Sequence, residues 1–584
     1  MSPEADLAQT VDGTGGMRNA AAPTPSVFPP PEAMRPTIVG RGWVVAAGHP
    51  LVAQVMARVL EEGGNAVDAG VAGTLASTVV QADMCNLGGI APLLARPAGS
   101  DRVWQVAGVG PWGQAATLEA FRARHGDDIP LGAPAGVVPG GFAALCEALA
   151  RWGSWRFRDV AAPAARLAAE GFPLDRRGAE ALAILGRGFA RWESSRRIYW
   201  PEGRPPRPGE TLVQADLGRT LLALAAEDRG PDRLAGIKAA RRAFYEGEIA
   251  ARLVAANREG GGFLSREDLA RHRADVSAAP SVSYRGHRVH AAGPFSQGPV
   301  LLQALALLGR HTLGRLGRGG AEHLHLVAEA LRLAFADRDR SYHDPAERPE
   351  ATEAILSPEH LEALGRTLDP GRAGWQGAEE ARGRARFDTT YVAAADAAGN
   401  VLSCMPSDTL DGAPVVEGLG FFVSPRGVQS RLDPAHPAAI APGRRPRITP
   451  APAIVVGPSG GAYALGCPGG DVIVQAMLQA VVNLHDFALS PQEAVEAPRV
   501  ATFSFPGSFF PNPCFPGRLD VEGRVPQAVR DDLAARGHRV HLWPDWEFDA
   551  GAVMLAGRMP LSPDGPPVLA AAADPRRSAY ALGG

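Results

Sequence analysis

The 584-residue sequence has few of the features that assign a protein to a specialised class. Its five cysteines are scattered and form no Cys-x-x-Cys pair, which excludes a disulfide framework and a zinc pattern and predicts buried, reduced thiols. The formal net charge is only −3, so no basic surface for nucleic acid is expected. No uninterrupted apolar run is long enough to span a bilayer. The sequence therefore predicts neither a nucleic-acid partner nor a membrane partner.

The N-terminal region also lacks the basic and apolar segments of a secretory signal, so we expect a cytoplasmic protein. Residues 1–37 are rich in proline, alanine and glycine, and we predict that they form a disordered N-terminal arm. The chain as a whole has an ordinary globular composition, with 46% hydrophobic and 21% charged residues. This is ample chain for a large core or for several domains.

Helices and short strands alternate along the ordered part of the chain. Apolar residues recur at helical spacing over 51–62, and a second, almost wholly apolar helix is predicted from 65 to 80. Short apolar runs predict strands at 282–289 and 420–423, and a further helix is expected to begin at Asp471. This mixture of helices and short strands favours an α+β fold.

One stretch combines a linker with a hairpin in an informative way. The polar, glycine-rich segment 370–386 leads into small and β-branched residues that begin at Thr389 and end at a Gly399-Asn400 turn, which predicts a β-hairpin. If the peptide bond before Thr389 were cut, the freed α-amine would lie beside the threonine hydroxyl and could act as its base. The unperturbed pKa of an α-amine is about 8, so it is partly neutral at pH 7. Taken alone, however, such a run more often marks the start of a surface hairpin.

Several motifs together resemble one family. Asp388-Thr-Thr-Tyr391, the run Asp396-Ala-Ala-Gly-Asn400 and the serine after it resemble the start of the small subunit in the γ-glutamyltransferase family. Members of that family are N-terminal-nucleophile hydrolases that cleave themselves before a threonine. Further motifs match it in the same order: His49-Pro-Leu51, Gly63–Ala69, Leu87-Gly-Gly89, Ala334–Arg338, His343-Asp-Pro345 and Ala573–Arg577. The resemblance therefore spans about residues 40–584.

The resemblance implies an architecture and a division of the chain. It implies an α+β, four-layer αββα sandwich, in which two antiparallel sheets are stacked between helices. Cleavage between Asp388 and Thr389 would give a large-subunit part, 38–388, and a small-subunit part, 389–584, which form one intertwined domain. The two fragments would stay associated, and a homodimer could form. No metal or organic cofactor is implied.

The resemblance also assigns candidate catalytic residues. Thr389 is the expected nucleophile, because Gly399 follows it at the spacing of the family. Ser407 stands where the family has a second hydroxyl that hydrogen-bonds the nucleophile and assists self-cleavage; a plain loop serine is the alternative. Gly469 and Gly470 match the family's oxyanion hole, since successive glycines let backbone N–H groups approach a developing alkoxide. A simple strand-to-helix turn is the alternative for these glycines.

The residues that bind the glutamyl head group depart from the family pattern. An α-carboxylate and an α-ammonium need partners of opposite charge. The segment 108–114 has no arginine where the family has its carboxylate-binding arginine. Ile448-Thr449 replaces a pair of serines. The chain has Gln429, with Arg426 nearby, where the family has its ammonium-binding aspartate. Where the family often has an amide side chain, this chain reads Asp408-Thr409.

Four residues are therefore candidates for binding a different substrate: Thr409, Arg426, Gln429 and Thr449. Arg426, Arg444 or Arg445 could hold a simpler anion, although solvated surface arginines are the more common case. A site built for a zwitterion binds it poorly without its charged partners. We therefore expect that the substrate is not a standard γ-glutamyl peptide.

These observations lead to one main hypothesis and two alternatives. The main hypothesis is an autoprocessing, threonine-nucleophile amidohydrolase or acyltransferase that acts on a small-molecule amide. Members of the family without the glutamyl clamp resemble either oxamate amidohydrolases or acylases of side-chain amides, and both stay open. The first alternative is a true γ-glutamyltransferase or glutathione hydrolase with a rearranged clamp. The second is an uncleaved, inactive scaffold with the same fold.

Overall fold

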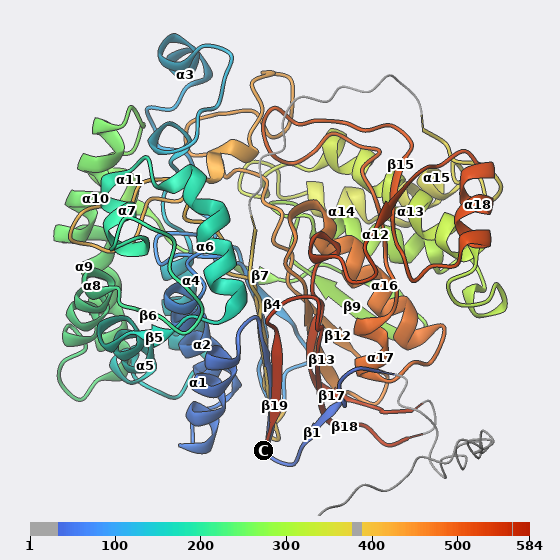
Figure 1. The fold of residues 1–584 in the computed structure, drawn as a ribbon, viewed down its shortest axis with the longest axis horizontal. Coiled ribbons are helices and arrows are strands. Elements are labelled where there is room, and N and C mark those ends of the chain that lie inside the picture. The colour runs from blue at the N-terminus through green and yellow to red at the C-terminus, as the bar shows by residue number, and fades with distance from the viewer. Residues whose placement is uncertain (1–32, 376–387, 563–564) are drawn as a thin grey trace, which may run out of the picture.

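The computed structural model describes residues 33–375, 388–562 and 565–584, and it shows a four-layer molecule (Figure 1). Two sheets of seven strands each lie face to face, and helices cover both outer faces. The predicted α+β, αββα sandwich is confirmed.

The first sheet contains the hairpin that the sequence analysis singled out. Its strands are all antiparallel and follow the order β19-β2-β10-β11-β3-β4-β7. They are β2 (Trp43–Ala47), β3 (Leu93–Arg96), β4 (Trp104–Val106), β7 (Val276–Ala278), β10 (Val392–Asp396), β11 (Val401–Cys404) and β19 (Tyr580–Gly583). The predicted hairpin is confirmed as β10 and β11, with β10 in the middle of the sheet between β2 and β11.

The second sheet is also antiparallel, in the order β1-β18-β17-β13-β12-β9-β8. Its strands are β1 (Ile38–Gly40), β8 (Ser281–Tyr284), β9 (His287–Ala291), β12 (Ala453–Val456), β13 (Ala462–Gly466), β17 (Met554–Met559) and β18 (Val568–Ala573). The single strand predicted at 282–289 is wrong: Arg285 and Gly286 have φ of 47° and 80° and turn the chain between β8 and β9. The strand predicted at 420–423 is also absent, since Gly420 has φ of 77° and leaves the extended conformation.

Helices form the two outer layers, as Figure 1 shows. On the first sheet lie α1 (Pro50–Glu61), α2 (Ala66–Val80) and α4 (Gly141–Trp152), and on the second α12 (Gly298–Leu308), α13 (Ala321–Ser341), α16 (Ile473–His485) and α17 (Pro491–Glu496). Both predicted N-terminal helices are confirmed. Pro50 begins α1, and a capping box of Asn65 and Asp68 begins α2. Every residue of α2 is buried, which explains why it is apolar all round.

The remaining elements pack outside this frame or at its ends. The other helices are α3 (Leu118–His125), α5 (Phe157–Glu170), α6 (Arg176–Phe189), α7 (Glu193–Tyr199), α8 (Ala215–Ala226), α9 (Arg233–Glu246), α10 (Glu248–Glu259), α11 (Arg266–Arg271), α14 (Ala351–Ile355), α15 (Pro358–Gly365) and α18 (Gln527–Ala535). A three-stranded sheet contains β14 (Val500–Thr502), β15 (Arg518–Glu522) and β16 (Arg539–Trp543), and β5 (Phe172–Pro173) pairs with β6 (Thr211–Leu212).

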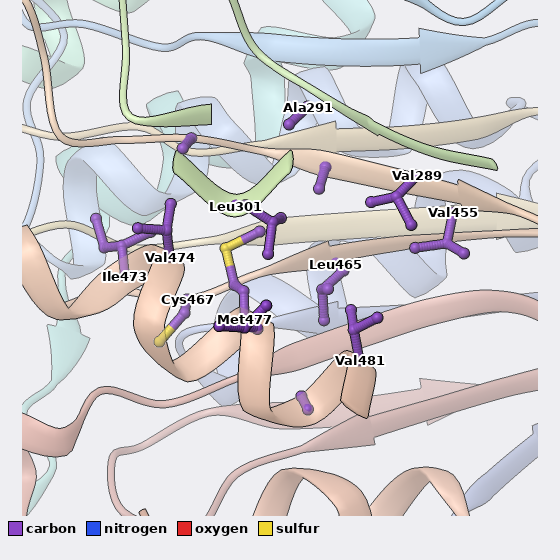
Figure 2. Close-up of a cluster of buried hydrophobic side chains, with 14 of the residues drawn as sticks. Val289, Ala291, Leu301, Val455, Leu465, Cys467, Ile473, Val474, Met477 and Val481 are labelled. Atoms are coloured by element: carbon purple, nitrogen blue, oxygen red, sulfur yellow. The ribbon is translucent and has the colours of Figure 1, made fainter. Parts of the chain in front are cut away.

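The central strands are buried on both faces, and this sets their composition. Along β10, Val392 and Ala394 pack in the core with α1 and α2, while Ala393 and Ala395 pack between the two sheets. Because side chains alternate along a strand, a strand covered on both faces needs a continuous apolar run. Figure 2 shows the second helical layer, where α12 and α16 pack against β9, β12 and β13.

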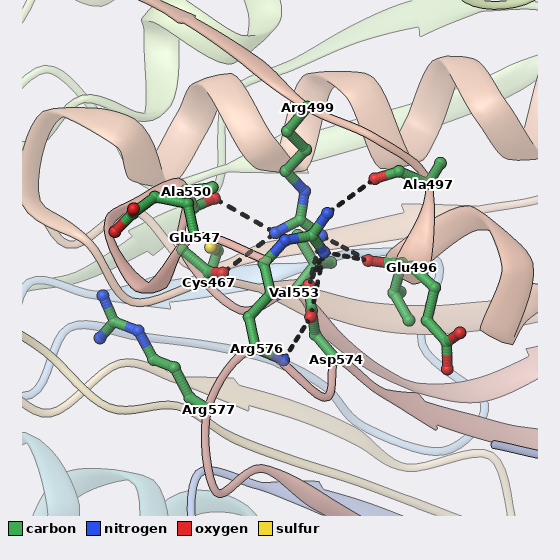
Figure 3. Close-up of polar contacts among 12 residues, drawn as sticks. Cys467, Glu496, Ala497, Arg499, Glu547, Ala550, Val553, Asp574, Arg576 and Arg577 are labelled. Atoms are coloured by element: carbon green, nitrogen blue, oxygen red, sulfur yellow. Dashed lines mark hydrogen bonds and ion pairs between the residues drawn. The ribbon is translucent and has the colours of Figure 1, made fainter. Parts of the chain in front are cut away.

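A buried polar cluster fixes the connection between β18 and β19 (Figure 3). Asp574 forms ion pairs with Arg499 and Arg576, and Arg576 also pairs with Glu522 at 2.7 Å. Burial by itself would raise the pKa of Asp574, but the two arginines hold it below its usual value. The side chain of the next residue, Arg577, points away from this cluster.

The N-terminal arm is predicted to end at residue 37, but the attached chain starts earlier. The backbone N–H groups of Met34 and Arg35 donate to the carboxylate of Glu496, and the Arg35 side chain donates to the Ala579 carbonyl at 2.7 Å. Residues 1–32 of the predicted arm, and most of the predicted linker 370–386, lie outside the described residues. Within the described ranges, no helix has both the length and the apolar character needed to cross a bilayer.

Candidate functional site

The β10–β11 hairpin brings Thr389 opposite Ser407. Val392 pairs with Cys404 in this hairpin, and an isolated bridge between Thr389 and Ser407 continues the same register beyond the strand ends. Thr389 therefore lies just before β10 and is only 1% exposed. Its Oγ1 is 2.8 Å from the Oγ of Ser407.

The same serine reaches the peptide bond at which cleavage is predicted. Ser407 Oγ donates a hydrogen bond of 2.8 Å to the main-chain carbonyl oxygen of Asp388. A serine has one hydroxyl hydrogen, so the hydrogen between Thr389 and Ser407 belongs to the threonine. The two hydroxyls and the Asp388 carbonyl thus form one directed hydrogen-bond chain.

Arg426 is a further hydrogen-bond partner of Ser407. Its guanidinium donates to Ser407 Oγ, pairs with the carboxylate of Asp408, and donates to Gln429 Oε1 at 3.1 Å. At 1% exposure Arg426 is not the surface arginine that sequence reasoning favoured. Nothing in the local sequence indicates this burial, because the carboxylate that compensates the charge belongs to Asp408, 18 residues earlier in the chain.

Asp408 combines a buried charge with an unusual backbone conformation. Its φ is 99°, which is rare for a residue other than glycine, and its other carboxylate oxygen accepts a hydrogen bond of 2.6 Å from Ser424. The ion pair with Arg426 and this hydrogen bond stabilise the strained turn that follows Ser407. In the sequence, Asp408 is distinguished only as a departure from the family pattern.

The other predicted binding residues occupy two different places. Gln429 and Thr449 are fully buried and share a hydrogen bond of 3.4 Å, so they extend the network behind Arg426. Thr409 instead lines the large cavity described below. Arg444 and Arg445 each pair with acidic residues, Arg444 with Glu347 and Arg445 with Asp275 and Asp344. The side chain of Arg445 is only 8% exposed, so it too is not a solvated surface arginine.

Gly469 and Gly470 lie between β13 and α16. Their φ values are 130° and 59°, a conformation that favours glycine at both positions. Neither N–H group has a hydrogen-bond partner among the described residues. The helix predicted from Asp471 begins with a 3₁₀ turn over Gly470–Val472, and α16 starts at Ile473. The carboxylate of Asp471 is already held by Arg338 at 2.9 Å.

Two adjoining cavities connect these residues. The larger has a volume of about 410 Å³ and is lined by Asp388, Thr409, Gly469 and Gly470 together with a group of aromatic side chains. These are Phe503, Phe505, Phe509, Phe515 and Phe548. The smaller, of about 50 Å³, is lined by Thr389, Thr390 and Pro468. Arg577 and Phe548 line both cavities, so the predicted nucleophile and the paired glycines lie on neighbouring parts of one recess.

Arg577 was missed by sequence reasoning as a site residue. Its Nη1 is 2.7 Å from Oδ2 of Asp388, and its Nε and Nη2 donate to the Phe548 carbonyl at 3.3 and 3.2 Å. The guanidinium carbon also lies 3.8 Å from the centre of the Phe548 ring. The sequence showed only the second arginine of an Arg-Arg pair, and nothing local separated its role from that of Arg576.

Asp83 was also missed, and it lines both cavities. Burial raises the pKa of Asp83 to about 7, and the nearby carboxylates of Asp388 and Asp175 add to the shift, while Arg577 opposes it. His49 lines the smaller cavity, where burial lowers its pKa. The recess therefore holds an acid that changes its charge near neutral pH.

The four-layer sandwich, with two antiparallel sheets between helices, is the fold of the N-terminal-nucleophile hydrolases. The gamma-glutamyltranspeptidase model matches residues 52–584, and the chain belongs to that family. This confirms the resemblance found in the sequence.

Known relatives agree with this assignment. The acylase ACY 1 proenzyme of Pseudomonas sp. (strain SE83) is 33% identical over 539 residues, covering 89% of this chain and 91% of the relative. The glutathione hydrolase-like YwrD proenzyme of Bacillus subtilis (strain 168) is 28% identical over 558 residues, covering 94% and 100%. The structure of cephalosporin acylase from Bacillus halodurans superposes with a TM-score of 0.82 at 27% identity, covering 96% and 99%. The prediction of a hydrolase or acyltransferase of this family is confirmed.

The elevated pKa of Asp83 predicts a pH-dependent stability. The folded state favours the neutral carboxyl, so its stability falls as the pH rises from the usual value of 3.8 to about 7 and is then constant. In the Thr389→Ala variant, where Asp388 should stay attached, Asp83→Asn should therefore raise the melting temperature by a gain that grows from about pH 5 to pH 8. We expect a difference of at least about 2 °C between these pH values.

Thermal unfolding at the two pH values measures this difference. Asp101→Asn, at an exposed position, serves as the matched control and should give no pH-dependent gain. An equal gain for Asp83→Asn at both pH values would show that the carboxyl is already ionised near pH 5.

Proposed function

We propose that this chain is an autoprocessing amidohydrolase whose nucleophile is the hydroxyl of Thr389. The observation that carries the proposal is the hydrogen-bond chain from Thr389 through Ser407 to the carbonyl of Asp388, with 2.8 Å at each step. It supports the proposal because the nucleophile, a proton acceptor and the bond to be cut are already aligned in the intact chain.

Self-cleavage follows from this arrangement. Thr389 Oγ1 forms a bond to the carbonyl carbon of Asp388, its proton passes to Ser407, and the proton of Ser407 passes to the carbonyl oxygen. The carbonyl then re-forms, the C–N bond breaks, and the nitrogen of Thr389 takes up that proton and becomes a free α-amine. Water hydrolyses the resulting ester and separates residues 1–388 from 389–584. Arg426 stabilises negative charge that develops on Ser407.

The mature reaction uses the amine that this cleavage creates. The α-amine of Thr389 takes the hydroxyl proton as the oxygen attacks an amide carbonyl. The N–H groups of Gly469 and Gly470, which lack partners among the described residues, hold the oxyanion. The amide C–N bond breaks, the amine leaves with the proton, and water then hydrolyses the acyl-threonine ester to the acid.

The cavity favours a large, partly apolar substrate. A volume of about 410 Å³ lined by phenylalanines suits an aromatic or other apolar group and far exceeds what oxamate requires. This favours acylase-like chemistry over oxamate hydrolysis. Segment 108–114 contains no arginine, and its Trp112 is buried and donates a hydrogen bond of 3.0 Å to Ser430. This loop therefore offers no cation to a glutamyl carboxylate.

The first prediction from this proposed function concerns self-cleavage of the chain. Wild-type protein should separate into two fragments on a denaturing gel, and mass spectrometry should show that the smaller one begins at Thr389. Thr389→Ala should remain one chain, because the attacking oxygen is gone. Thr390→Ala is the matched control and should be cleaved like the wild type, since the Thr390 hydroxyl donates to Gln81 instead. A single intact band for the wild type, unchanged by Thr389→Ala, would favour the inactive scaffold.

The second prediction concerns Ser407. Ser407→Ala should slow self-cleavage by at least ~100-fold, because the Asp388 carbonyl loses its donor and Thr389 loses its proton acceptor. A time course of fragment appearance on denaturing gels measures the rate. Ser403→Ala removes another buried serine hydroxyl, which bonds Tyr391 at 2.7 Å, and should be cleaved within a few-fold of the wild-type rate. Equal rates for the two variants would contradict a chemical role for Ser407.

The third prediction concerns the substrate. The processed enzyme should hydrolyse glutaryl-p-nitroanilide at least ~10-fold more efficiently than γ-glutamyl-p-nitroanilide, because the α-ammonium of the latter would be desolvated without an acidic partner. The two substrates differ only in that ammonium group, so the ratio of kcat/KM isolates its contribution. Faster turnover of the γ-glutamyl substrate would instead support a true γ-glutamyltransferase with a rearranged clamp.

A further inference from the structure

The Gly469–Gly470 turn has no side chain of its own to hold it. It stands between Cys467 and Ile473, which are both fully buried in the core shown in Figure 2. A Cβ built on Gly469 would lie 3.5 Å from its nearest neighbour, which is an ordinary contact, so close packing does not confine the backbone there. The first side chain after the glycines that can fix this backbone belongs to Asp471.

The carboxylate of Asp471 is held by three side chains from separate parts of the fold. Its Oδ1 accepts hydrogen bonds from Gln297 Nε2 at 2.7 Å, Arg338 Nη1 at 2.9 Å and Ser508 Oγ at 2.6 Å. Its Oδ2 accepts a hydrogen bond from the Ser508 N–H at 2.9 Å. Gln297 precedes α12, Arg338 belongs to α13, and Ser508 lies between β14 and β15. The carboxylate therefore joins the glycine turn to three elements that pack around it.

This carboxylate does not cap the helix that follows it. Asp471 lies just before α16, where an acidic side chain commonly accepts hydrogen bonds from the first N–H groups of the helix. In the part of the chain that the structure describes, all four hydrogen bonds to the carboxylate come instead from outside α16. The side chain thus restrains the turn from outside the helix.

Gln297 is a buried amide of which only one end is used. It is 1% exposed, and its Oε1 has no hydrogen-bond partner within the described ranges. A buried acceptor without a partner lowers stability, so the packing of the core does not explain a polar side chain at this position. What the amide contributes is the hydrogen bond that its Nε2 donates to Asp471, together with a longer one of 3.3 Å to Ser508.

We propose that Asp471 is a positioning residue for hydrolysis, because its carboxylate fixes the backbone that presents the N–H groups of Gly469 and Gly470 to the oxyanion. This inference rests on the proposed function and adds the group that orients its oxyanion hole. The anchored turn keeps the two donors in place before the reaction, so they need not reorganise when the negative charge develops. Gln297 is part of this anchor.

Self-cleavage does not use this anchor. The carbonyl oxygen of Asp388 accepts its hydrogen bond from Ser407, which in turn is bonded by Arg426. Loss of the anchor should therefore slow the hydrolysis of a substrate and leave the processing of the chain unchanged. A general loss of folding would slow both reactions.

The aromatic wall of the larger cavity has anchors of its own. Arg431 donates to the Gly507 carbonyl at 3.1 Å, and the Phe510 N–H donates to the Val428 carbonyl at 2.8 Å. These contacts do not involve Asp471, so a change at Asp471 should have little effect on substrate binding. Because an oxyanion-hole contact is made only in the transition state, kcat should fall and KM should not.

The test measures hydrolysis of glutaryl-p-nitroanilide by processed wild type, Gln297→Met and Asp471→Asn, with rates expressed per amount of small fragment. Asp471→Asn should lower kcat by at least ~30-fold and Gln297→Met by at least ~5-fold, each with KM changed less than about threefold. Both variants should cleave themselves within about threefold of the wild-type rate. The melting temperature of Gln297→Met should stay within about 2 °C of the wild type, because removal of the unpaired acceptor offsets the lost hydrogen bond.

Asp486→Asn is the matched control at the other end of α16. The carboxylate of Asp486 is buried and is also held by an arginine and a hydroxyl, Arg285 at 2.8 Å and Tyr284 at 2.6 Å, and it lines neither cavity. This substitution should leave kcat within about twofold of the wild type. An equal loss of kcat in Asp486→Asn and Asp471→Asn would overturn the positioning role.

Each further outcome assigns the failure to one proposal. A wild-type kcat in Gln297→Met, or a loss of kcat matched by an equal loss of self-cleavage, would overturn the role of Asp471 and leave the amidohydrolase proposal intact. Absence of cleavage in the wild type would overturn the amidohydrolase proposal itself. If Asp471→Asn does not fold, Gln297→Met alone decides.

A second probe covers an anilide that the processed wild type does not hydrolyse. Acetylation of Thr389 by p-nitrophenyl acetate, followed by the mass of the small fragment, then replaces kcat. Its rate should fall at least ~5-fold in Gln297→Met, because the attack on this ester also develops an oxyanion. An unchanged rate would overturn the inference.

Discussion

The hydrogen-bond chain from Arg426 through Ser407 to Thr389 and the Asp388 carbonyl is the interaction on which the rest of the site depends. It exists because two neighbouring strands keep one register beyond their ends, which places a threonine opposite a serine. Those strands are held in the middle of a sheet that is buried on both faces, so the register cannot slip without moving apolar side chains out of two cores. The main role of the sandwich is thus to position the functional groups precisely, and supplying such groups is secondary.

Buried charge is the second constraint. Arg426 is compensated by Asp408, and Arg499 and Arg576 by Asp574; the pair of Arg499 with Asp574 joins residues 75 positions apart in the chain. Such pairs are weak sources of stability, but losing one partner is costly. The pair of Arg577 with Asp388 differs, because the proposed reaction itself removes the acid. The same event that frees the α-amine of Thr389 would therefore also separate Arg577 from this acid.

Local sequence patterns predicted individual parts of the site better than they predicted which residues come together in it. Three features were recognisable in the sequence: the β10–β11 hairpin, the threonine that precedes it and the pair of glycines. Turns and glycine-dependent conformations depend mainly on the identity of neighbouring residues. The predicted strands at 282–289 and 420–423 were wrong because one or two residues with positive φ turned the backbone. Arg426 looked like a surface residue for a different reason: its burial depends on the carboxylate of Asp408, 18 residues earlier in the chain.

The sequence alone determined the family, the sandwich architecture, and the presence of a threonine and a pair of glycines at the positions of the family's nucleophile and oxyanion hole. Only the tertiary structure decided that Ser407 reaches the Asp388 carbonyl, that Arg426, Gln429 and Thr449 lie behind that serine, and that Arg577 and Asp83 face the recess. The physical reason is that hydrogen bonds and ion pairs between distant segments depend on the packing of whole layers. A one-dimensional pattern records which residues are available for such contacts, and the folded layers select which of them meet.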